Sequence, residues 1–284
     1  MQITVIGAAN IDIVTKSKSK IKKGSSNPAD VSLKAGGVAR NIAAMLALRG
    51  VDVSLISAVG KDPFGNMLRD SCNDIGINTD AWIFKNNAST GVYLTTLESD
   101  GQQYTAFDAM SIPESIRTAE ITKHKKIIRE ADLVIMDLNL SEKIIALIIE
   151  LRDSKPLMVN AVSVDRIMRI KDFLGQINIL KLNRLEAEKL TGIQLDSKER
   201  VKQACNSIIS RGVQRVFITM GMAGVCAADS RSAIFVPAIP VVLKDLTGAG
   251  DAFSTGIAIK FEKDLRSQAE SGIKHAADHL NRKR

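Results

Sequence analysis

The chain has 284 residues, of which 45% are hydrophobic and 25% charged, a composition typical of soluble globular proteins that excludes collagen-like and low-complexity classes. No apolar run reaches the roughly 18 residues of a membrane-spanning helix, and the first residues lack the basic stretch of a secretory leader, so a cytoplasmic protein is expected. The net charge of +8 is compatible with a nucleic-acid partner or with an anionic substrate.

The predicted elements alternate between strands and helices along most of the chain. A short apolar strand over 3–7 precedes a helix-period segment that starts near Val38, with Gly50 at its stop, and a second apolar strand covers 53–59. The alternation continues with strands over 133–137, 157–160, 177–182 and 215–220, and with helices over 141–151, where Ser141 is the N-cap, 184–190 and 198–211. Repeated strand–helix units with apolar strands predict an α/β fold with a mostly parallel sheet covered on both faces.

Two stretches depart from this alternation. Residues 11–35 contain a Lys- and Ser-rich segment followed by alternating apolar residues, and residues 91–108 have the pattern of a hairpin with a turn at 99–101. We expect the two stretches to form one small sheet that acts as a lid over the strand ends, where α/β proteins bind ligands. Because no repeat or linker is evident, the chain is interpreted as a single domain over 1–284 that carries this lid.

The basic residues do not form a nucleic-acid-binding pattern. They gather in 16–23, in 123–126 and in 282–284, and aromatic residues make up only 4% of the chain, so no base-stacking platform accompanies them. We interpret these clusters as solvated surface, and we expect neither a nucleic-acid nor a membrane partner.

The cysteines and histidines indicate no metal or redox centre. Cys72, Cys205 and Cys226 are odd in number and include no Cys-x-x-Cys pair, so buried thiols are expected. His275 and His279 lie four residues apart on a predicted helix, but no third ligand accompanies them, which favours surface residues over a metal pair.

A Gly-rich loop, Thr247-Gly248-Ala249-Gly250-Asp251, leads into a helix-period segment that continues from Phe253. Unpaired N–H groups and the helix dipole converge at such a start, so the loop predicts an anion site. On this stretch alone, Asp251 is either a stabiliser of the helix N-terminus or, if phosphate binds, the base for an acceptor hydroxyl. The second interpretation predicts a kinase that has neither a Walker A loop nor a dinucleotide fingerprint.

A second Gly-rich stretch, Gly36-Gly37, also opens a helix, and its glycines permit a ligand to touch the backbone. Arg40 and Asn41 fall in the first turn, in position to bond sugar hydroxyls or a base carbonyl, although such Gly pairs also serve as simple turns. Asn10 and Asp12 follow the first strand and alternate onto one side, which suits a diol. For Asp12, a solvent-facing place on an edge strand is equally open.

Together, in this order and spacing, the two Gly-rich stretches resemble the signatures of the ribokinase-like (PfkB) sugar kinases, and the resemblance covers nearly the whole chain. Further matches are Gly60 to Gly65, Asn183-Arg-Leu-Glu186 and Thr219 to Gly224. A narrower resemblance, to pseudouridine kinases, rests on Gly7 to Asp12, Ser26-Asn27-Pro28, Arg40-Asn41, Asp137-Leu-Asn139, Val162-Ser163 and Leu182 to Ala187. The resemblance implies a three-layer α/β/α fold with a lid, and transfer of the ATP γ-phosphate to the 5′-hydroxyl of pseudouridine.

The resemblance also implies roles for individual residues. Asp251 is the implied base, with Gly248, Ala249 and Gly250 as the anion hole. The implied acceptor-binding residues are Asn10, Asp12, Gly36, Gly37, Arg40, Asn41 and Asn139, and the implied nucleotide-binding residues are Asn183, Thr219, Gly221, Gly224 and Thr247. Glu186 and Asn183 are expected to hold Mg²⁺ partly through water, Asp245 is expected near a K⁺ ion, and a homodimer is expected through the lid. For Glu186, a solvated place in the first turn of a helix stays open.

The chain departs from the family pattern at three places, one of which is Leu246, where a small or β-branched residue is usual. Asn160-Ala161-Val162-Ser163, with Arg166 following, stands where pseudouridine kinases read Asp-Pro-Val-Ser and a lysine, so altered base recognition is expected. The sequence also stops at Arg284, where relatives continue with a loop and helix that wall the adenine pocket. We expect another subunit or a shorter loop to close the pocket, or weak ATP binding. The alternatives are therefore another PfkB sugar or nucleoside kinase, or a catalytically impaired kinase-fold binding protein.

Overall fold

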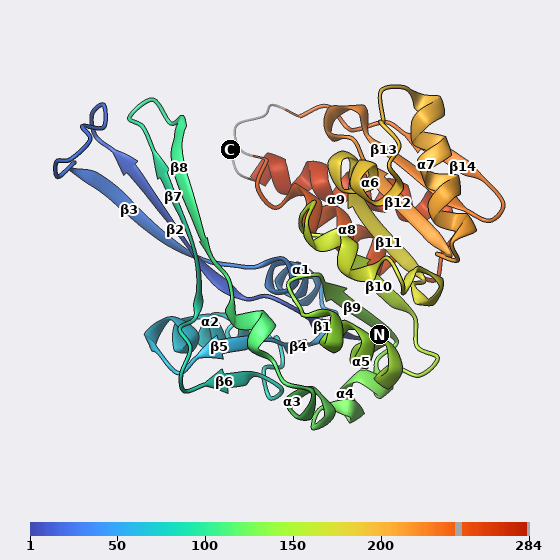
Figure 1. The fold of residues 1–284 in the computed structure, drawn as a ribbon, viewed down its shortest axis with the longest axis horizontal. Helices are drawn as coiled ribbons and strands as arrows, with labels where there is room; N and C mark the ends of the chain where they lie inside the picture. The colour runs from blue at the N-terminus through green and yellow to red at the C-terminus, as the bar shows by residue number, and fades with distance from the viewer. Residues whose placement is uncertain (242–245, 283–284) are drawn as a thin grey trace.

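The computed structural model describes residues 1–241 and 246–282, and within these residues the main sheet has eight strands. Their order is β14 (Ala233–Val236), β13 (Val225–Asp229), β12 (Arg215–Thr219), β11 (Ile179–Asn183), β10 (Leu157–Asn160), β9 (Leu133–Asp137), β1 (Gln2–Ile6) and β4 (Asp52–Ile56). The strands from β12 to β4 are parallel, and β13 and β14 add an antiparallel edge (Figure 1). The predicted mostly parallel sheet is confirmed.

Successive side chains of the central strands enter two different hydrophobic cores, one on each face of the sheet. In β9, Leu133 and Ile135 belong to one core, while Val134 and Met136 belong to the other. The first core packs against α1 (Val38–Ala47), α2 (Pro63–Asn73), α8 (Ala249–Ile259) and α9 (Leu265–Arg282). The second packs against α3 (Thr118–Thr122), α4 (Lys125–Glu130), α5 (Glu142–Leu151), α6 (Arg184–Thr191) and α7 (Lys198–Ser210). Burial on both faces explains why these strands read as continuous apolar runs.

The lid sheet projects from the body and is formed, in order, by β3 (Ala29–Gly36), β2 (Asn10–Ser17), β7 (Gly91–Leu97) and β8 (Gln103–Ala109) (Figure 1). Because side chains alternate between the two faces of a strand, the pairing register defines a polar face with Lys34, Asp12, Tyr93 and Asp108 in one row. The next row lies on the apolar face and consists of Leu33, Ile13, Leu94 and Phe107. Since β2 lies inside this sheet, the edge-strand interpretation of Asp12 is wrong.

The predicted strand over 53–59 is wrong as a single element. The chain leaves the main sheet after β4, and β5 (Ala58–Gly60) pairs instead with β6 (Ile83–Lys85). The change of partner occurs at Ser57, whose carbonyl accepts a 2.9 Å hydrogen bond from the amide of Ile83. An uninterrupted apolar run carries no mark of where a strand exchanges one neighbour for another.

Other predicted boundaries agree with the structure to within a few residues. Ser141 is the N-cap residue of α5, although its side chain forms no capping bond. The sequence interpretation did not include α2, which begins at Pro63 after Asp62 accepts a 2.8 Å bond from the amide of Gly65. Short 3-10 helices complete the described elements: η1 (Ile112–Ser115), η2 (Arg166–Ile170), η3 (Leu174–Gln176) and η4 (Gly221–Ala223).

The cysteines are buried and free, as expected. Two of them that are distant in sequence, Cys205 of α7 and Cys226 of β13, nevertheless lie side by side with a distance of 3.6 Å between their Sγ atoms. Among the helices of the described ranges, none has the length and apolar character that crossing a membrane requires.

Candidate active site

The Gly-rich loop ends at the start of α8. Gly248 has a left-handed backbone with φ 79°, and α8 begins at the next residue. A Cβ on Gly248 would lie 2.8 Å from Nε2 of His279, and one on Gly250 would lie 3.0 Å from Nζ of Lys181. The amide of Ala249 donates to the Leu246 carbonyl at 3.2 Å, whereas the Gly250 amide has no hydrogen bond within the described ranges. The glycines therefore let a histidine and a lysine approach the start of α8.

Asp251 lies in the first turn of α8 and faces Asn41 of α1. The Asn41 Nδ2 group donates a 2.9 Å hydrogen bond to Asp251 Oδ2. Burial raises the pKa of Asp251 to about 6, against the opposing effects of the Asn41 bond and the Lys181 charge, and the carboxylates of Asp137 and Asp12 add to the rise. A carboxylate with a pKa near neutrality is suited to accept a proton at physiological pH.

Asn10 and Asp12 lie on one side of β2, as predicted. Asn10 is 3% exposed, and its Nδ2 group donates a 2.6 Å hydrogen bond to Asp12 Oδ1. Burial raises the pKa of Asp12, although the Asn10 bond opposes the rise. A Cβ on Gly36 would lie 2.4 Å from Asp12 Oδ2, and one on Gly37, where φ is 99°, would lie 2.4 Å from the Ala8 carbonyl oxygen. Because these two positions have no side chain, the Asp12 carboxylate packs against the backbone of Gly36, and the Ala8 carbonyl packs against the backbone of Gly37.

Asp137, at the end of β9, joins the segments that carry the expected acceptor-binding residues. It is 1% exposed and accepts 3.0 Å hydrogen bonds from the amides of Ala8 and Ala39. Its other oxygen accepts 2.9 Å bonds from both the backbone amide and the Nδ2 group of Asn139. Burial raises the pKa of Asp137, although these bonds oppose the rise. The Nδ2 group of Asn139 is therefore engaged in holding this buried carboxyl group.

The Arg40 side chain turns back toward the lid. Its Nη1 group donates to the Ala35 carbonyl at 3.1 Å and to Asn41 Oδ1 at 3.5 Å. Because Ala35 belongs to β3 and Asn41 to α1, the guanidinium of Arg40 stabilises the junction between these two elements.

A cavity of about 520 Å³ adjoins the Gly-rich loop, a volume in the usual range for small-molecule sites. The expected nucleotide-binding residues Asn183, Thr219, Gly221 and Gly224 line it, together with Lys181, Ala249 and Gly250. Its apolar wall includes Leu246, Phe253, Ile273, Ala276, Ala277 and Leu280. The last four of these belong to α9, so this helix supplies much of the apolar wall of the cavity.

Local geometry explains the residue types at the strand ends beside this cavity. The Thr219 hydroxyl donates to the Leu182 carbonyl at 3.2 Å, which ties β12 to β11. Gly224 has φ 93°, and a Cβ there would lie 2.1 Å from the Val236 carbonyl oxygen, so only glycine fits. Thr247 follows Leu246, which lines the cavity, and its carbonyl oxygen accepts a 3.0 Å hydrogen bond from His279 Nε2.

Glu186 and Asn183 form a reciprocal capping box at the start of α6. The amide of Glu186 donates to Asn183 Oδ1 at 2.9 Å, and the amide of Asn183 donates to Glu186 Oε2 at 2.7 Å. Glu186 is 2% exposed, so its interpretation as a solvated residue is wrong. Burial raises the pKa of Glu186, although the Lys181 charge and the Asn183 amide oppose the rise. Asp245 lies outside the described residues.

Sequence reasoning missed three residues of this region. In the sequence analysis Asp137 appeared only as part of a motif, because its burial depends on two loops that meet only in the folded structure. Lys181 was signalled by a single charge in the apolar strand β11, Ile-Leu-Lys-Leu-Asn. For His279, interpreted as a surface residue, no sequence signal indicated the contact with the Gly-rich loop.

Comparisons with known proteins agree with this geometry. The model of the pfkB family of carbohydrate kinases matches residues 1–276. Pseudouridine kinase of Escherichia coli (strain K12) is 35% identical over 257 residues, which are 90% of this chain and 82% of that protein. Guanosine-inosine kinase of Exiguobacterium acetylicum is 26% identical, with 98% of this chain and 93% of that protein covered.

A solved structure shows the same fold. Arabidopsis thaliana ribokinase, complexed with ribose and ATP, superposes with a TM-score of 0.88 at 24% identity, covering 98% of this chain and 92% of that one. The ribokinase-like fold is confirmed, and the match of the family model over almost the full length shows that the chain belongs to the PfkB family of carbohydrate kinases.

Proposed function

We propose that the protein transfers the γ-phosphate of ATP to the 5′-hydroxyl of pseudouridine. The observation that carries the proposal is the hydrogen bond between Asn41 and Asp251, which joins the two Gly-rich segments beside the cavity. The 35% identity to pseudouridine kinase supports the choice of acceptor.

In the proposed reaction, Asp251 orients the acceptor hydroxyl and takes its proton as the oxygen attacks the γ-phosphorus. A bond forms between the acceptor oxygen and the γ-phosphorus, the bond from that phosphorus to the bridging oxygen of ADP breaks, and ADP departs with the electron pair. Asp251 then releases its proton to solvent. The amides at the start of α8, with Gly248, Ala249 and Gly250, stabilise the charge on the migrating group, and Lys181 adds a positive charge next to Gly250.

The remaining binding roles follow the positions of the side chains. Asp12, held by Asn10, accepts hydrogen bonds from the ribose hydroxyls, while Gly36, Gly37 and Asn41 line the same site. Arg40 stabilises this site through its hydrogen bond to the Ala35 carbonyl, and Asn139 does so through its hydrogen bond to the Asp137 carboxylate. The 520 Å³ cavity takes the nucleotide, with its base against the apolar wall from α9.

Magnesium fits this site only with help from water and phosphate. Asn183 lines the cavity, but Asn183 Oδ1 and Glu186 Oε2 already accept capping bonds, and the described residues contain no cluster of three or more His, Cys, Asp or Glu side chains that suits a metal. Mg²⁺ commonly keeps several waters and binds one or two carboxylates plus substrate phosphates. We therefore assign Asn183 and Glu186 to its water shell, where the ion would neutralise phosphate charge. We also propose that K⁺ binds near Asp245.

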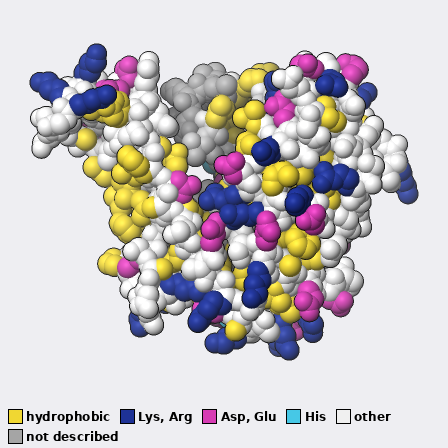
Figure 2. Space-filling view, in the orientation of Figure 1, with side chains coloured by type: hydrophobic (Ala, Val, Ile, Leu, Met, Phe, Trp, Pro, Cys, Tyr) yellow, Lys and Arg dark blue, Asp and Glu magenta, His cyan; other side chains and the backbone are white. Residues whose placement is uncertain are grey.

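We also propose a single kinase domain over 1–284, a cytoplasmic location, and a homodimer formed through the apolar face of the lid sheet. On this face Val31, Leu33 and Phe107 are 60%, 47% and 60% exposed, and Figure 2 shows hydrophobic side chains gathered along the flank of the lid. Exposed apolar patches of this kind mark interaction surfaces, and the register gives the opposite face to Asp12.

The test is an assay of purified protein with ATP, Mg²⁺ and pseudouridine, uridine, inosine, adenosine or ribose as acceptor, with kcat/KM compared between acceptors. A highest value for pseudouridine supports the proposal. A higher kcat/KM for another acceptor would show that the protein has a different PfkB activity. Binding of nucleoside without phosphoryl transfer at saturating ATP would show that it is a binding protein.

A further inference from the structure

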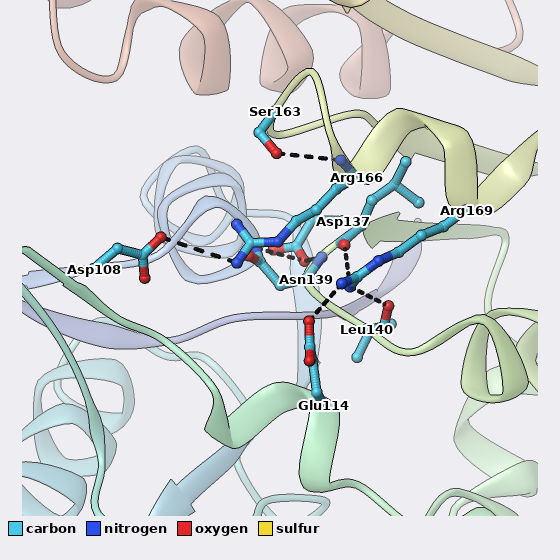
Figure 3. Close-up of polar contacts among 9 residues, drawn as sticks. Asp108, Glu114, Asp137, Asn139, Leu140, Ser163, Arg166 and Arg169 are labelled. Atoms are coloured by element: carbon cyan, nitrogen blue, oxygen red, sulfur yellow. Dashed lines mark hydrogen bonds and ion pairs between the residues drawn. The ribbon is translucent and has the colours of Figure 1, made fainter.

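The lid and the body meet through an ion pair beyond the expected sugar site. Arg166, the first residue of η2, places Nη2 3.9 Å from Oδ2 of Asp108 on β8. Figure 3 shows the guanidinium extending from the body toward the lid carboxylate. The Asp108 side chain is 50% exposed, and pairs this long and this exposed contribute only about 0–1 kcal/mol. The contact can therefore open for a ligand at little cost to the fold.

Arg169, one turn later, provides a contrast. Its Nη1 group donates to the carbonyls of Leu138 and Leu140 at 3.1 and 2.8 Å, and its Nη2 group pairs with Glu114 at 2.5 Å. Arg169 is thus committed to holding the loop together (Figure 3). Within the described ranges, the guanidinium of Arg166 has only the Asp108 contact, so most of its five N–H donors remain available.

The backbone that presents Arg166 is strained. Val162 has φ 69°, a left-handed conformation that is a genuine outlier for a β-branched residue. The amide of Ser163 donates to the Ala161 carbonyl at 2.8 Å, which holds the turn. Such strain costs on the order of 1–3 kcal/mol, persists where the surrounding structure imposes it, and clusters at ligand sites. The loop therefore fixes the direction from which η2 presents Arg166.

The register of the lid places a row of functional groups in front of Arg166. Asp12 pairs with Tyr93, and Tyr93 pairs with Asp108, so the three lie across β2, β7 and β8 on the polar face. With adjacent strands about 4.8 Å apart, the strands of Asp12 and Asp108 are about 10 Å apart. If Asp12 holds the ribose, a free pentose is too short to reach Asp108. The base of a nucleoside, in contrast, extends to Asp108 and lies next to the Tyr93 ring.

We propose that Asp108 and Arg166 together recognise a lactam edge of the nucleoside base, with Asp108 accepting from a ring N–H and Arg166 donating to the adjacent carbonyl. Pseudouridine carries such an N–H at two ring positions, uridine at one, and inosine and guanosine at one. Adenine has no carbonyl, cytosine has no ring N–H beside its carbonyl, and ribose has no base. The inference rests on the proposed function, from which it takes the position of the ribose.

The experiment compares two pairs of acceptors that differ at this edge, inosine with adenosine and uridine with cytidine. Dissociation constants from calorimetry and kcat/KM values are measured for the wild type, Asp108→Ala, Asp108→Asn and Arg166→Gln. We expect the wild type to prefer the lactam member of each pair, and the ratio to fall about tenfold or more in Asp108→Ala and Arg166→Gln. Asp108→Asn keeps an acceptor oxygen and is expected to retain part of the preference.

Asp30→Asn is the matched control, since Asp30 is another lid carboxylate in an exposed ion pair, 3.3 Å from Lys18, and its ratio should stay within twofold of the wild type. The inference is overturned if the wild type shows no lactam preference, or if Asp108→Ala and Arg166→Gln leave the ratios unchanged. Absence of phosphoryl transfer with every acceptor would refute the proposed function alone, because the calorimetric ratios would still decide the recognition of the base.

Discussion

Asn41 and Asp251 are separated by 210 positions in the chain, and a 2.9 Å hydrogen bond joins their side chains. The bond connects the first turn of α1 with the first turn of α8, so it brings the two Gly-rich segments together. Because the carboxylate accepts from Asn41 while burial raises its pKa to about 6, the basicity of Asp251 depends on this contact.

Replacing Asp251 by Asn is expected to lower kcat by about 10²–10⁴-fold, the usual contribution of a general base. Steady-state kinetics with saturating ATP and nucleoside measures the loss. Full activity in the variant would remove Asp251 from the proposed role.

The same substitution is expected to raise the free energy of unfolding at pH 8. The folded pKa of about 6 exceeds the unfolded value of about 3.9, so the folded state binds more protons and stability falls as pH rises from about 4 to 6. Asp251→Asn removes this loss, which amounts to about 1–3 kcal/mol. Urea unfolding at pH 8 and at pH 4 tests the sign, because the gain should be largest at pH 8.

The pH dependence of kcat/KM should have an acid limb near pH 6, below which activity falls as Asp251 becomes protonated. Asn41→Ala removes a hydrogen bond that lowers the Asp251 pKa, so the limb should move to higher pH. Asn66→Ala, at an exposed position of α2, is the control and should leave the limb in place. An unmoved limb in Asn41→Ala would show that the bond does not set the basicity of Asp251.

Alanine substitutions at Gly36 and Gly37 should have different effects. The new Cβ at position 36 would meet the carboxylate at the end of the Asp12 side chain, whereas at position 37 it would meet the Ala8 backbone at a φ of 99°. We expect Gly36→Ala to raise KM for the acceptor with little loss of stability, and Gly37→Ala to cost about 2 kcal/mol or more. Acceptor kinetics and urea unfolding on both variants distinguish the two effects, and equal stability losses would contradict the assignment.

Asp137→Asn tests the buried carboxyl group that receives bonds from Ala8, Ala39 and Asn139. An amide offers one acceptor oxygen in place of two and turns an NH₂ group toward the donors, so a loss of about 1–3 kcal/mol is expected. Asp172→Asn, on a 78% exposed side chain, is the matched control and should change stability by less than about 0.5 kcal/mol. Similar urea midpoints for the two variants would contradict the role of Asp137.

The fold was largely predictable because strands buried on both faces read as apolar runs, as in Leu133–Asp137. The exchange of partners at Ser57 was not, since hydrophobicity records burial and not the identity of the neighbouring strand. The Asp62-Pro63 pair that starts α2 is an N-cap signal. The helix was not predicted because the prediction relied on apolar periodicity.

For the site, the family resemblance assigned Asn41 and Asp251 to one reaction, but the hydrogen bond between them was not predicted from the sequence. The approach of Lys181 and His279 to the Gly-rich loop depends on how β11 and α9 pack against α8, which short-range patterns do not encode. Burial likewise changed the interpretation of Glu186, because a first-turn carboxylate has the same sequence signature whether it is solvated or enclosed.

The alternation of the two lid faces has a consequence for length variation in this protein. Deleting one residue from β2 would exchange the places of Asp12 and Ile13, turning an apolar side chain toward the proposed sugar site and a carboxylate toward the opposite surface. The connection over 18–28 lies beyond the paired strands and has no such constraint. Insertions and deletions should therefore be tolerated at the tip of the lid and eliminated from its strands.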